Sequence, residues 1–463
     1  MNQDTICAIA TAQGGAIGSI RVSGPEAISI TGSIFKPAKT GKLLSEQKPY
    51  TLTFGRIYDG DEIIDEVLVS LFRAPHSYTG EDSTEITCHG SSYILQQVMQ
   101  LLIKNGCRMA QPGEYTQRAF LNGKMDLSQA EAVADLIASS SAATHRLAMS
   151  QMRGGFSREL TELRNKLLNF TSMIELELDF SEEDVEFADR SELRRIAGNI
   201  DELLTRLCRS FSLGNVIKNG VPVAIVGNTN VGKSTLLNAL LREDRAIVSD
   251  IAGTTRDVIE DTINLNGITF RFIDTAGIRA TSDEVENIGI ERTFAKIGQA
   301  SVVLLLTDLN RGVESFEEYY HQVKSRLTSD AKLIIVLNKT DQVEDLLTPQ
   351  ETIRLFTSGE EIIPISARTG ANLDRLIQEL TRTVNLNTLN TSDVIVSNVR
   401  HYEALRNART AIERVNEGLE SGLSGEFISQ DIRECLHYLG EITGEITTDE
   451  VLGNIFKNFC IGK

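Results

Sequence analysis

The sequence predicts a multidomain fold with three parts: an α+β domain at the N-terminus, an all-α helical domain, and an α/β domain inserted into the helical domain. A length of 463 residues exceeds what one compact core normally holds. The texture changes from short apolar runs to long helical periodicity near Asp126, then to buried strands, and returns to helices near Asn385. The predicted boundaries are residues 1–120, 121–215, 216–384 and 385–463, with the first and second parts of the helical domain on either side of the α/β domain.

Residues 1–120 alternate short apolar runs with turn signals, which is typical of β-strands. These runs are TICAIAT, AIGSIRVSG, YTLTFGRIYDG, EVLVSLF and STEITCHG. One amphipathic helix is predicted in SSYILQQVMQLLIKNG, which ends at Gly106. Together they indicate an α+β domain.

Long helical patterns with few helix breakers follow. They are SQAEAVADLIASSSAATHRLAM, SRELTELRNKLLNFTSMIELELDF and SELRRIAGNIDELLTRLCRSF, and later HYEALRNARTAIERVNEGL and DIRECLHYLGEITG. Residues 385–463 are few for an independent domain. We therefore expect them to complete the helical domain that begins near Asp126.

Between these helical parts the chain is expected to loosen at Gly214 to Gly220 and to enter a series of buried strands. The strands are VPVAIVG, ITFRFID, SVVLLLTD, KLIIVLN and EIIPISA. Helical patterns between most of them indicate a mostly parallel sheet in a layered α/β domain. Asn266-Gly267 predicts an antiparallel hairpin between the second and third strands of this sheet.

Composition excludes several classes of protein. Hydrophobic residues make up 41% and charged residues 24%, and no apolar run approaches the roughly 18 residues of a membrane span. The N-terminus MNQDTICAIA lacks the features of a signal peptide. The 6 cysteines contain no C-x-x-C pair, so a cytoplasmic location is expected rather than a disulfide framework or zinc site. A net charge of −18 attracts nucleic acid poorly, so an RNA partner would need a local basic patch.

A phosphate-binding loop begins the α/β domain. Residues Gly227 to Ser234 match G-x-x-x-x-G-K-[ST], after an apolar strand and before a helix with leucines on its buried side. The glycines allow backbone N–H groups to surround phosphates, and the helix N-terminus favours negative charge. Lys233 is expected to reach the β- and γ-phosphates, and the Ser234 hydroxyl to bind Mg²⁺.

Three further motifs follow at the ends of later strands. Asp274 begins D-T-A-G, Asn338 begins N-K-T-D, and Ser366 begins S-A-R. Their order and their places at strand ends resemble those of GTPases, and this resemblance assigns Asp341 to the N1 and N2 donors that guanine presents and adenine lacks. The predicted nucleotide-binding residues are Asn230, Val231, Gly232, Lys233, Ser234, Thr235, Ser249, Asp250, Ile251, Ala252, Gly253, Thr254, Thr255, Asp274, Thr275, Ala276, Gly277, Asn338, Lys339, Asp341, Ser366, Ala367 and Arg368.

The two switch segments raise a question about the attacking water. Ile278 follows D-T-A-G, where Ras-like proteins place the glutamine that orients this water. Asp283, Glu284 and Glu286 are candidates for its replacement, and a solvated acidic loop is the alternative. Thr255 is the expected Mg²⁺ ligand of the first switch. Arg256 could serve as an arginine finger or in a surface ion pair.

Motifs along almost the whole chain resemble the MnmE (TrmE) family of tRNA-modification GTPases. They are R-V-S-G from Arg21, Y-T-G-E-D from Tyr78, P-G-E-Y-T-Q-R-A-F-L-N-G-K from Pro112 to Lys124, D-L-S-Q-A-E-A from Asp126, the nucleotide motifs, and the final F-C-I-G-K. Two departures are Cys88-His-Gly-Ser, where the family has Gly-His-Gly-Gly, and variation around Asn122.

The resemblance implies an activity and partners. Such proteins act with an FAD-dependent partner protein, as a heterotetramer, to add an aminomethyl-type (carboxymethylaminomethyl) group to carbon 5 of the wobble uridine of certain tRNAs. Their N-terminal domain forms a homodimer and binds a tetrahydrofolate derivative (5-formyl- or methylene-tetrahydrofolate) that supplies one carbon. By motif match, the folate contacts are Arg21, Glu85, Lys124 and Lys463.

The resemblance also implies K⁺-stimulated hydrolysis, in which Glu286 aligns the water as the catalytic residue. Asn230 matches the K⁺ ligand, supported by Ser249, Ile251 and Thr254. A cation there would neutralise charge that develops between the β- and γ-phosphates. Cofactors are thus GTP, Mg²⁺, K⁺ and a tetrahydrofolate.

Cys460 has two interpretations: a nucleophile toward carbon 6 of the uridine, or a cysteine that is merely buried or incidental. Two other functions also stay open. A GTP-regulated RNA-binding or ribosome-assembly factor would carry a basic RNA-binding module after the α/β domain. A GTP-gated scaffold would bind folate without consuming it.

Overall fold

The computed structural model describes residues 4–12, 14–39, 43–179, 190–247, 261–273, 297–308, 313–328, 331–343, 347–384, 394–457, 459 and 462. They form two compact units. The first contains residues 1–137, 149–202 and 404–463, and the second contains residues 138–148 and 203–403.

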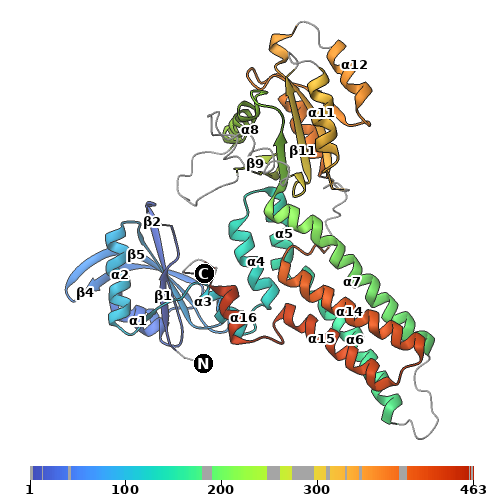
Figure 1. Ribbon diagram of the computed structural model, residues 1–463. Coiled ribbons are helices and arrows are strands. Elements are labelled where there is room, and N and C mark those ends of the chain that lie inside the picture. Colours follow the sequence, from blue (N-terminus) through green and yellow to red (C-terminus); the bar gives the residue numbers. More distant parts are fainter. Residues whose placement is uncertain are drawn as a thin grey trace. The chain divides into compact units, whose positions relative to one another are not determined.

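The N-terminal part of the first unit is built on a seven-stranded sheet in the order β3-β4-β5-β6-β2-β1-β7 (Figure 1). Among the described strands of this sheet, only the β1–β7 pair is parallel. The strands are β1 (Ile6–Ile9), β2 (Ile17–Ser23), β3 (Phe35–Pro37), β4 (Thr51–Asp59), β5 (Glu62–Phe72), β6 (Ser83–His89) and β7 (Arg108–Met109).

Alternation along the strands gives this sheet a core face and an outer face. On β2, Ile20 and Val22 are buried, while Arg21 between them points to the other face. Helices α1 (Ala27–Ile34) and α2 (Ser92–Lys104) pack on the core face. Arg21 pairs in register with Glu85 of β6, so both belong to the outer face.

The helices described outside the α/β part and after α3 include α4 (Leu127–Ala138), α5 (Ala142–Met152), α6 (Gly155–Asp179), α7 (Arg190–Asn219), α14 (Val399–Ser421), α15 (Gly425–Thr443) and α16 (Asp449–Phe456). In the first unit α15 packs along α6, and α14 is tied to α15 by ion pairs of Arg414 with Asp431 and Glu434 (Figure 1). The described residues from position 404 on thus belong to the same unit as α6, which precedes the α/β part in the chain.

The second unit contains a six-stranded sheet in the order β13-β12-β11-β8-β10-β9. Its strands and helices are β8 (Val221–Val226), α8 (Lys233–Ile247), β9 (Asp261–Leu265), β10 (Ile268–Phe272), β11 (Val302–Asp308), α11 (Val313–Lys324), β12 (Lys332–Asn338), α12 (Leu347–Phe356), β13 (Glu361–Pro364) and α13 (Leu373–Thr383). All pairs are parallel except β9–β10. Apolar clusters cover both faces, as expected for a parallel sheet between helices.

The predicted hairpin is confirmed. β9 and β10 pair antiparallel, and Asn266 and Gly267 between them have φ of 52° and 81°. Two positive φ values are the requirement of a type I′ turn, which asparagine followed by glycine meets at little cost.

Several short elements were not predicted from the sequence, among them α1, β3, β7, α3 (Glu114–Leu121) and α16. The chain was also expected to loosen at Gly214, but α7 continues to Asn219. At Gly214 a Cβ would lie 2.0 Å from the carbonyl oxygen of Val396, so glycine here permits close backbone packing rather than a loop.

Across the described residues, no helix is both long enough and apolar enough to cross a membrane.

Candidate functional site

The phosphate-binding loop connects β8 to α8 in the second unit, as its motif predicts. The ammonium of Lys233 donates to the carbonyl oxygens of Gly227 and Asn228 at 2.7 and 2.9 Å. Lys233 is also the first residue of α8, whose N-terminus carries a partial positive charge. The loop therefore presents an ammonium and a helix N-terminus in the same place, which is the arrangement that binds phosphates.

The two motif glycines are required by close contacts. A Cβ on Gly227 would lie 2.2 Å from the carbonyl oxygen of Leu306, and one on Gly232 would lie 2.3 Å from Nδ2 of Asn338. Gly232 also has φ of +99°, which side chains rarely adopt. Asn230 has φ of 60° in the same loop, and asparagine tolerates this region better than most residues.

Gly232→Ala is expected to weaken GTP binding by at least about tenfold, because the added methyl group must displace the Asn338 amide. A binding titration with a fluorescent GTP analogue measures this. Gly267→Ala is a matched control: φ there is +81°, but the nearest atom to the new Cβ is 3.6 Å away on Ala142. If both variants lose stability and only the Gly232 variant loses affinity, the contact with Asn338 is the cause. Equal affinity in the two variants would contradict this.

Asn338 joins three of the predicted motifs. Its Nδ2 donates to the carbonyl oxygen of Val231 at 2.8 Å, and its Oδ1 accepts from the N–H of Ala367 at 3.0 Å. The residue is 2% exposed. One buried amide therefore fixes the phosphate-binding loop, the N-K-T-D segment and the S-A-R segment against one another, and both of its polar ends are satisfied.

The base-recognition residues are oriented by neighbours. Ser366 Oγ donates to Asp341 Oδ1 at 2.7 Å, and Asp341 is exposed. Lys339, with φ of 66°, pairs with the buried Asp308 at 2.6 Å. A held, exposed carboxylate can accept two parallel N–H donors, which is what guanine presents through N1 and N2. Asp308, the last residue of β11, was not identified from the sequence.

The described residues therefore bring together the phosphate-binding loop, Asn338, Lys339, Asp341, Ser366 and Ala367. Thr235 and Arg368 are exposed beside them in the chain. The other predicted nucleotide, Mg²⁺ and K⁺ residues lie outside the described residues: Ser249, Asp250, Ile251, Ala252, Gly253, Thr254, Thr255, Asp274, Thr275, Ala276, Gly277 and Glu286.

A second candidate site lies on the outer face of the N-terminal sheet. Arg21 bonds to Oε1 of Glu85 through Nε at 2.9 Å and through Nη2 at 2.8 Å. Its Nη1 donates to the carbonyl oxygen of Gly462 at 3.3 Å. Both charged side chains remain partly exposed, at 25% and 32%. The sheet therefore holds the pair in place and leaves it accessible beside a residue of the C-terminal segment.

Two aromatic rings surround the guanidinium of Arg21. Its Cζ lies 5.7 Å from the ring centres of both Tyr78 and Tyr115. The hydroxyl of Tyr115 donates to the carbonyl oxygen of Arg21 at 2.7 Å, which holds the strand to α3. Burial raises the pKa of Tyr78, so it stays a neutral phenol near neutral pH. Neither tyrosine was predicted as a site residue, although both lie within motifs that carried the family resemblance.

Of the other predicted folate residues, Lys124 is described and Lys463 is not. The Lys124 ammonium donates to the carbonyl oxygen of Pro75 at 2.8 Å. The aliphatic part of the Lys124 side chain packs against Gly80, because a Cβ on Gly80 would be 3.3 Å from Lys124 Cδ. Lys124 therefore contacts the loop that carries Tyr78. Lys463 and Cys460 lie outside the described residues.

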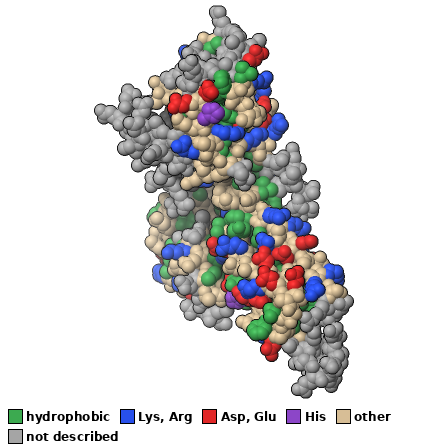
Figure 2. All heavy atoms as spheres, turned by 45° about the vertical axis from the view of Figure 1, so that its right-hand side comes forward, with side chains coloured by type: hydrophobic (Ala, Val, Ile, Leu, Met, Phe, Trp, Pro, Cys, Tyr) green, Lys and Arg blue, Asp and Glu red, His purple; other side chains and the backbone are tan. Residues whose placement is uncertain are grey.

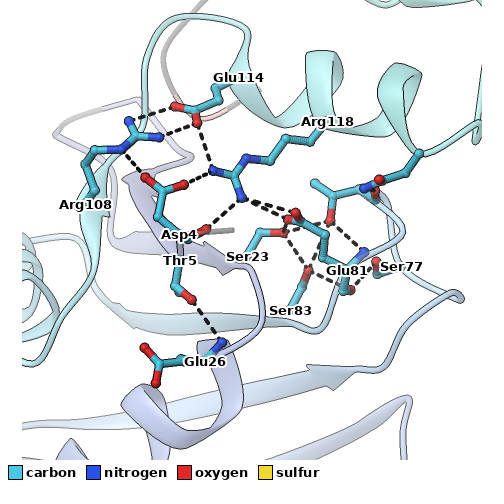
Figure 3. A network of polar contacts seen from close by, with 12 residues as sticks. Asp4, Thr5, Ser23, Glu26, Ser77, Glu81, Ser83, Arg108, Glu114 and Arg118 are labelled. Carbon is cyan, nitrogen blue, oxygen red and sulfur yellow. Dashed lines mark hydrogen bonds and ion pairs between the residues drawn. The ribbon is translucent and has the colours of Figure 1, made fainter. Parts of the chain in front are cut away.

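A network of charged side chains supports this second site (Figure 3). Arg118 of α3 pairs with Asp4 at 2.7 Å, Glu114 at 3.0 Å and Glu81 at 3.1 Å. Burial alone would raise the pKa of Glu114, but hydrogen bonds from Arg108, from the Gln111 N–H and from Arg118 outweigh it and lower that pKa. Glu114 is therefore held ionised against these arginines.

Comparison with known proteins identifies the family. A model of the MnmE helical domain matches residues 127–460, and a model of the N-terminus of the GTP-binding protein TrmE matches residues 5–124. A protein of Bacteroides thetaiotaomicron named tRNA modification GTPase MnmE is 69% identical over 466 residues, covering 100% of both chains. Proteins of the same name from Bacteroides fragilis and Parabacteroides distasonis are 71% and 62% identical, covering 100% and 99% of this chain and 100% of their own. Together with the two sites, these matches show that the chain belongs to the MnmE family of tRNA modification GTPases.

Proposed function

We propose that this chain hydrolyses GTP and that the hydrolysis serves the modification of tRNA. The observation that carries this proposal is the junction at Asn338, which joins the phosphate-binding loop to both base-recognition segments. A phosphate site and a guanine site are thereby held at one edge of one sheet. The names of relatives that match the chain over its whole length support the role in tRNA modification.

The reaction proposed is the addition of a carboxymethylaminomethyl-type group to carbon 5 of the wobble uridine, together with an FAD-dependent partner in a heterotetramer. A tetrahydrofolate derivative supplies the carbon when it is bound. Glu85 can accept the paired N–H donors of a pterin ring, and Arg21 and Lys124 suit the carboxylates of its glutamate tail. The ring of Tyr78, which is 38% exposed, adds apolar surface beside the pair. The residues present therefore fit a reduced folate.

Exposed apolar side chains on the outer face of the N-terminal sheet support the proposal that this part of the chain forms a homodimer. Among its exposed apolar side chains, Phe54 of β4 stands opposite Leu68 of β5, and Leu52 and Ile17 are 59% and 64% exposed. Uncovered apolar side chains that gather on one sheet face are typical of association surfaces. A second copy of the chain is the proposed occupant.

tRNA is the proposed substrate. Figure 2 shows acidic and basic side chains interspersed over the coloured part of the face in view. Arg414 and Arg433 are paired with carboxylates. These two arginines therefore do not form the local basic patch that RNA needs on a chain with a net charge of −18.

Cys460 is proposed as a nucleophile toward the uridine ring.

The segments proposed as domains are residues 1–120, 121–215, 216–384 and 385–463. An assembly factor would place an RNA-binding module after the α/β part, whereas residues 394–457 here form α14, α15 and α16. This helical C-terminal part favours the tRNA-modification function over that alternative.

K⁺ and Mg²⁺ complete the proposed nucleotide site. Ser234 and Thr255 would hold Mg²⁺, and Asn230, Ser249, Ile251 and Thr254 would hold K⁺. When bound, these cations neutralise the charge that develops on the phosphates. The structure describes two of these residues. Asn230 lies in the loop between β8 and α8, and Ser234 lies in the first turn of α8.

Asn230→Ala is expected to lose the stimulation of GTP hydrolysis by K⁺, because the amide oxygen that would bind the cation is removed. Alanine at φ of 60° also costs about 1 kcal/mol of backbone strain, so stability must be measured separately. Asn230→Gly removes the same amide without that strain. Rates in KCl and in equimolar NaCl measure the effect for both variants. A K⁺ response in the glycine variant as large as in the parent would contradict the assignment.

The modification itself is tested with the purified chain, its FAD-dependent partner, tRNA, GTP and ¹³C-labelled methylene-tetrahydrofolate. Mass analysis of the nucleosides should find the label on carbon 5 of the wobble uridine. Folate binding without transfer of label would instead favour a GTP-gated scaffold.

A further inference from the structure

We propose that Thr79, Glu81 and Arg118 are positioning residues of the folate site. Together with the hydroxyls of Ser23 and Ser83, they hold the loop of residues 77–82 so that Tyr78 stays against Arg21. This inference rests on the folate part of the proposed function and adds to it: affinity for a reduced folate is set in part by groups that do not touch the ligand.

The first step is a cluster of buried hydroxyls at the base of the loop. Ser23 and Thr79 share a hydrogen bond of 2.7 Å, and Ser83 donates to Ser23 at 3.1 Å. Exposure is 0% for Ser23, 1% for Thr79 and 6% for Ser83. Ser23 also donates to Oε2 of Glu81 at 2.8 Å. The loop is thus tied to β2 and β6 by hydrogen bonds shielded from water, where such bonds are strongest.

The second step is the ion pair that holds Glu81. Arg118 donates through Nη1 to both carboxylate oxygens of Glu81, at 3.1 and 3.3 Å, and to the carbonyl oxygen of Asp4 at 2.9 Å. The Arg118 side chain is 11% exposed. Figure 3 shows Arg118 between Glu81 on one side and Asp4 and Glu114 on the other. Arg118 thus ties Glu81 to Asp4 and Glu114, which are two further carboxylate partners of the same guanidinium.

The hydroxyl cluster lies next to Arg21 and Tyr78 of the proposed folate site. Ser23 lies two residues after Arg21 on β2, so their side chains belong to the same face of the sheet. Tyr78 directly precedes Thr79, and its hydroxyl shares a hydrogen bond of 2.9 Å with Thr116 of α3. The amide of Asn122 donates to the carbonyl oxygen of Thr79 at 2.7 Å. Tyr78 is thus held at its own hydroxyl and through the residue that follows it.

If Thr79 only stabilised the fold, any other buried pair of hydroxyls would serve equally well. The chain contains such a pair on the other face of the sheet. Thr31 of α1 and Thr84 of β6 share a hydrogen bond of 2.7 Å and are both 0% exposed. Thr84 neighbours Ser83 and Glu85 on β6 but points to the core face. Thr31→Val and Thr79→Val remove the same group from opposite faces of one sheet.

The experiment measures binding of 5-formyltetrahydrofolate to the full chain by calorimetry. Thr79→Val should bind about tenfold more weakly, the effect of about one buried hydrogen bond. Thr31→Val should bind within about twofold of the parent, although both variants lower the unfolding temperature. Thr79→Ser, which restores the hydroxyl, should regain most of the affinity. Hydrogen exchange without ligand should accelerate at residues 77–82 in Thr79→Val only.

The outcomes separate this inference from the function on which it rests. If the parent binds the folate and Thr79→Val binds it equally well, the positioning role is overturned and the folate site stands. Equal weakening in Thr79→Val and Thr31→Val would show a structural role alone. If the parent does not bind the folate, both proposals fail.

Discussion

Asp341→Asn should lower the affinity for GTP by on the order of 100-fold, because an amide cannot accept both guanine donors that a carboxylate accepts. Hydrogen bonds to a charged group are worth about 1.5–3 kcal/mol each, and one of the two would be replaced by a donor facing a donor. Ser366 orients the Asp341 carboxylate in the structure through a bond of 2.7 Å to Oδ1. Competition between GTP and ATP for a fluorescent nucleotide measures the change.

Asp374→Asn is the matched control for this prediction. Asp374 lies in the first turn of α13 and is exposed, so its replacement removes the same charge without touching the site. We expect its GTP affinity to match that of the parent. An undiminished preference of the Asp341 variant for GTP over ATP would count against the guanine site.

Glu286→Ala should keep GTP affinity and lose hydrolysis by a factor of about 100 or more, the range for loss of a group that positions or activates the attacking water. Ile278 stands where a glutamine would orient the water and has no polar atom to substitute. Both residues lie outside the described part of the chain, so this prediction rests on the sequence and on the family resemblance. Single-turnover hydrolysis in saturating K⁺ measures the rate.

Asp283→Ala and Glu284→Ala serve as controls, because all three carboxylates belong to the same acidic segment. If the segment only adds negative charge, the three variants should lose the same small amount of activity. Turnover of the Glu286 variant equal to that of the parent would exclude its catalytic role.

Most elements with a strong local pattern were predictable from the sequence. Long helices such as α6 and α7 carry many turns of helical periodicity, and the buried strands β11 and β12 are continuous apolar runs. The short helices α1 and α3 were missed for physical reasons. AISITGSI is rich in β-branched residues, and EYTQRAFL has little apolar periodicity. Both are stabilised by contacts distant in sequence, which local patterns do not encode.

The site residues were predictable where they belong to a sequence motif and where they follow neighbouring strands of one parallel sheet. The sequence predicted that the phosphate-binding loop, N-K-T-D and S-A-R would meet, and for the described residues they do. It did not predict that Asn338 would join them through its own amide, since that depends on contacts over 107 residues of chain. The pairing of Arg21 with Glu85 likewise follows from the register of β2 and β6. The family resemblance indicated both residues as folate contacts but not that they pair with each other.

The proposed dependence of this GTPase on K⁺ is tested most directly by the rate of GTP hydrolysis by the purified chain in KCl against equimolar NaCl. Dimerisation in the presence of GDP and aluminium fluoride is followed in parallel. We expect GTP hydrolysis to be much faster in K⁺, together with K⁺-dependent dimerisation. Equal rates in the two salts would contradict the assignment of Asn230 and its neighbours, and no hydrolysis of GTP in either salt would contradict the proposed GTPase activity as a whole.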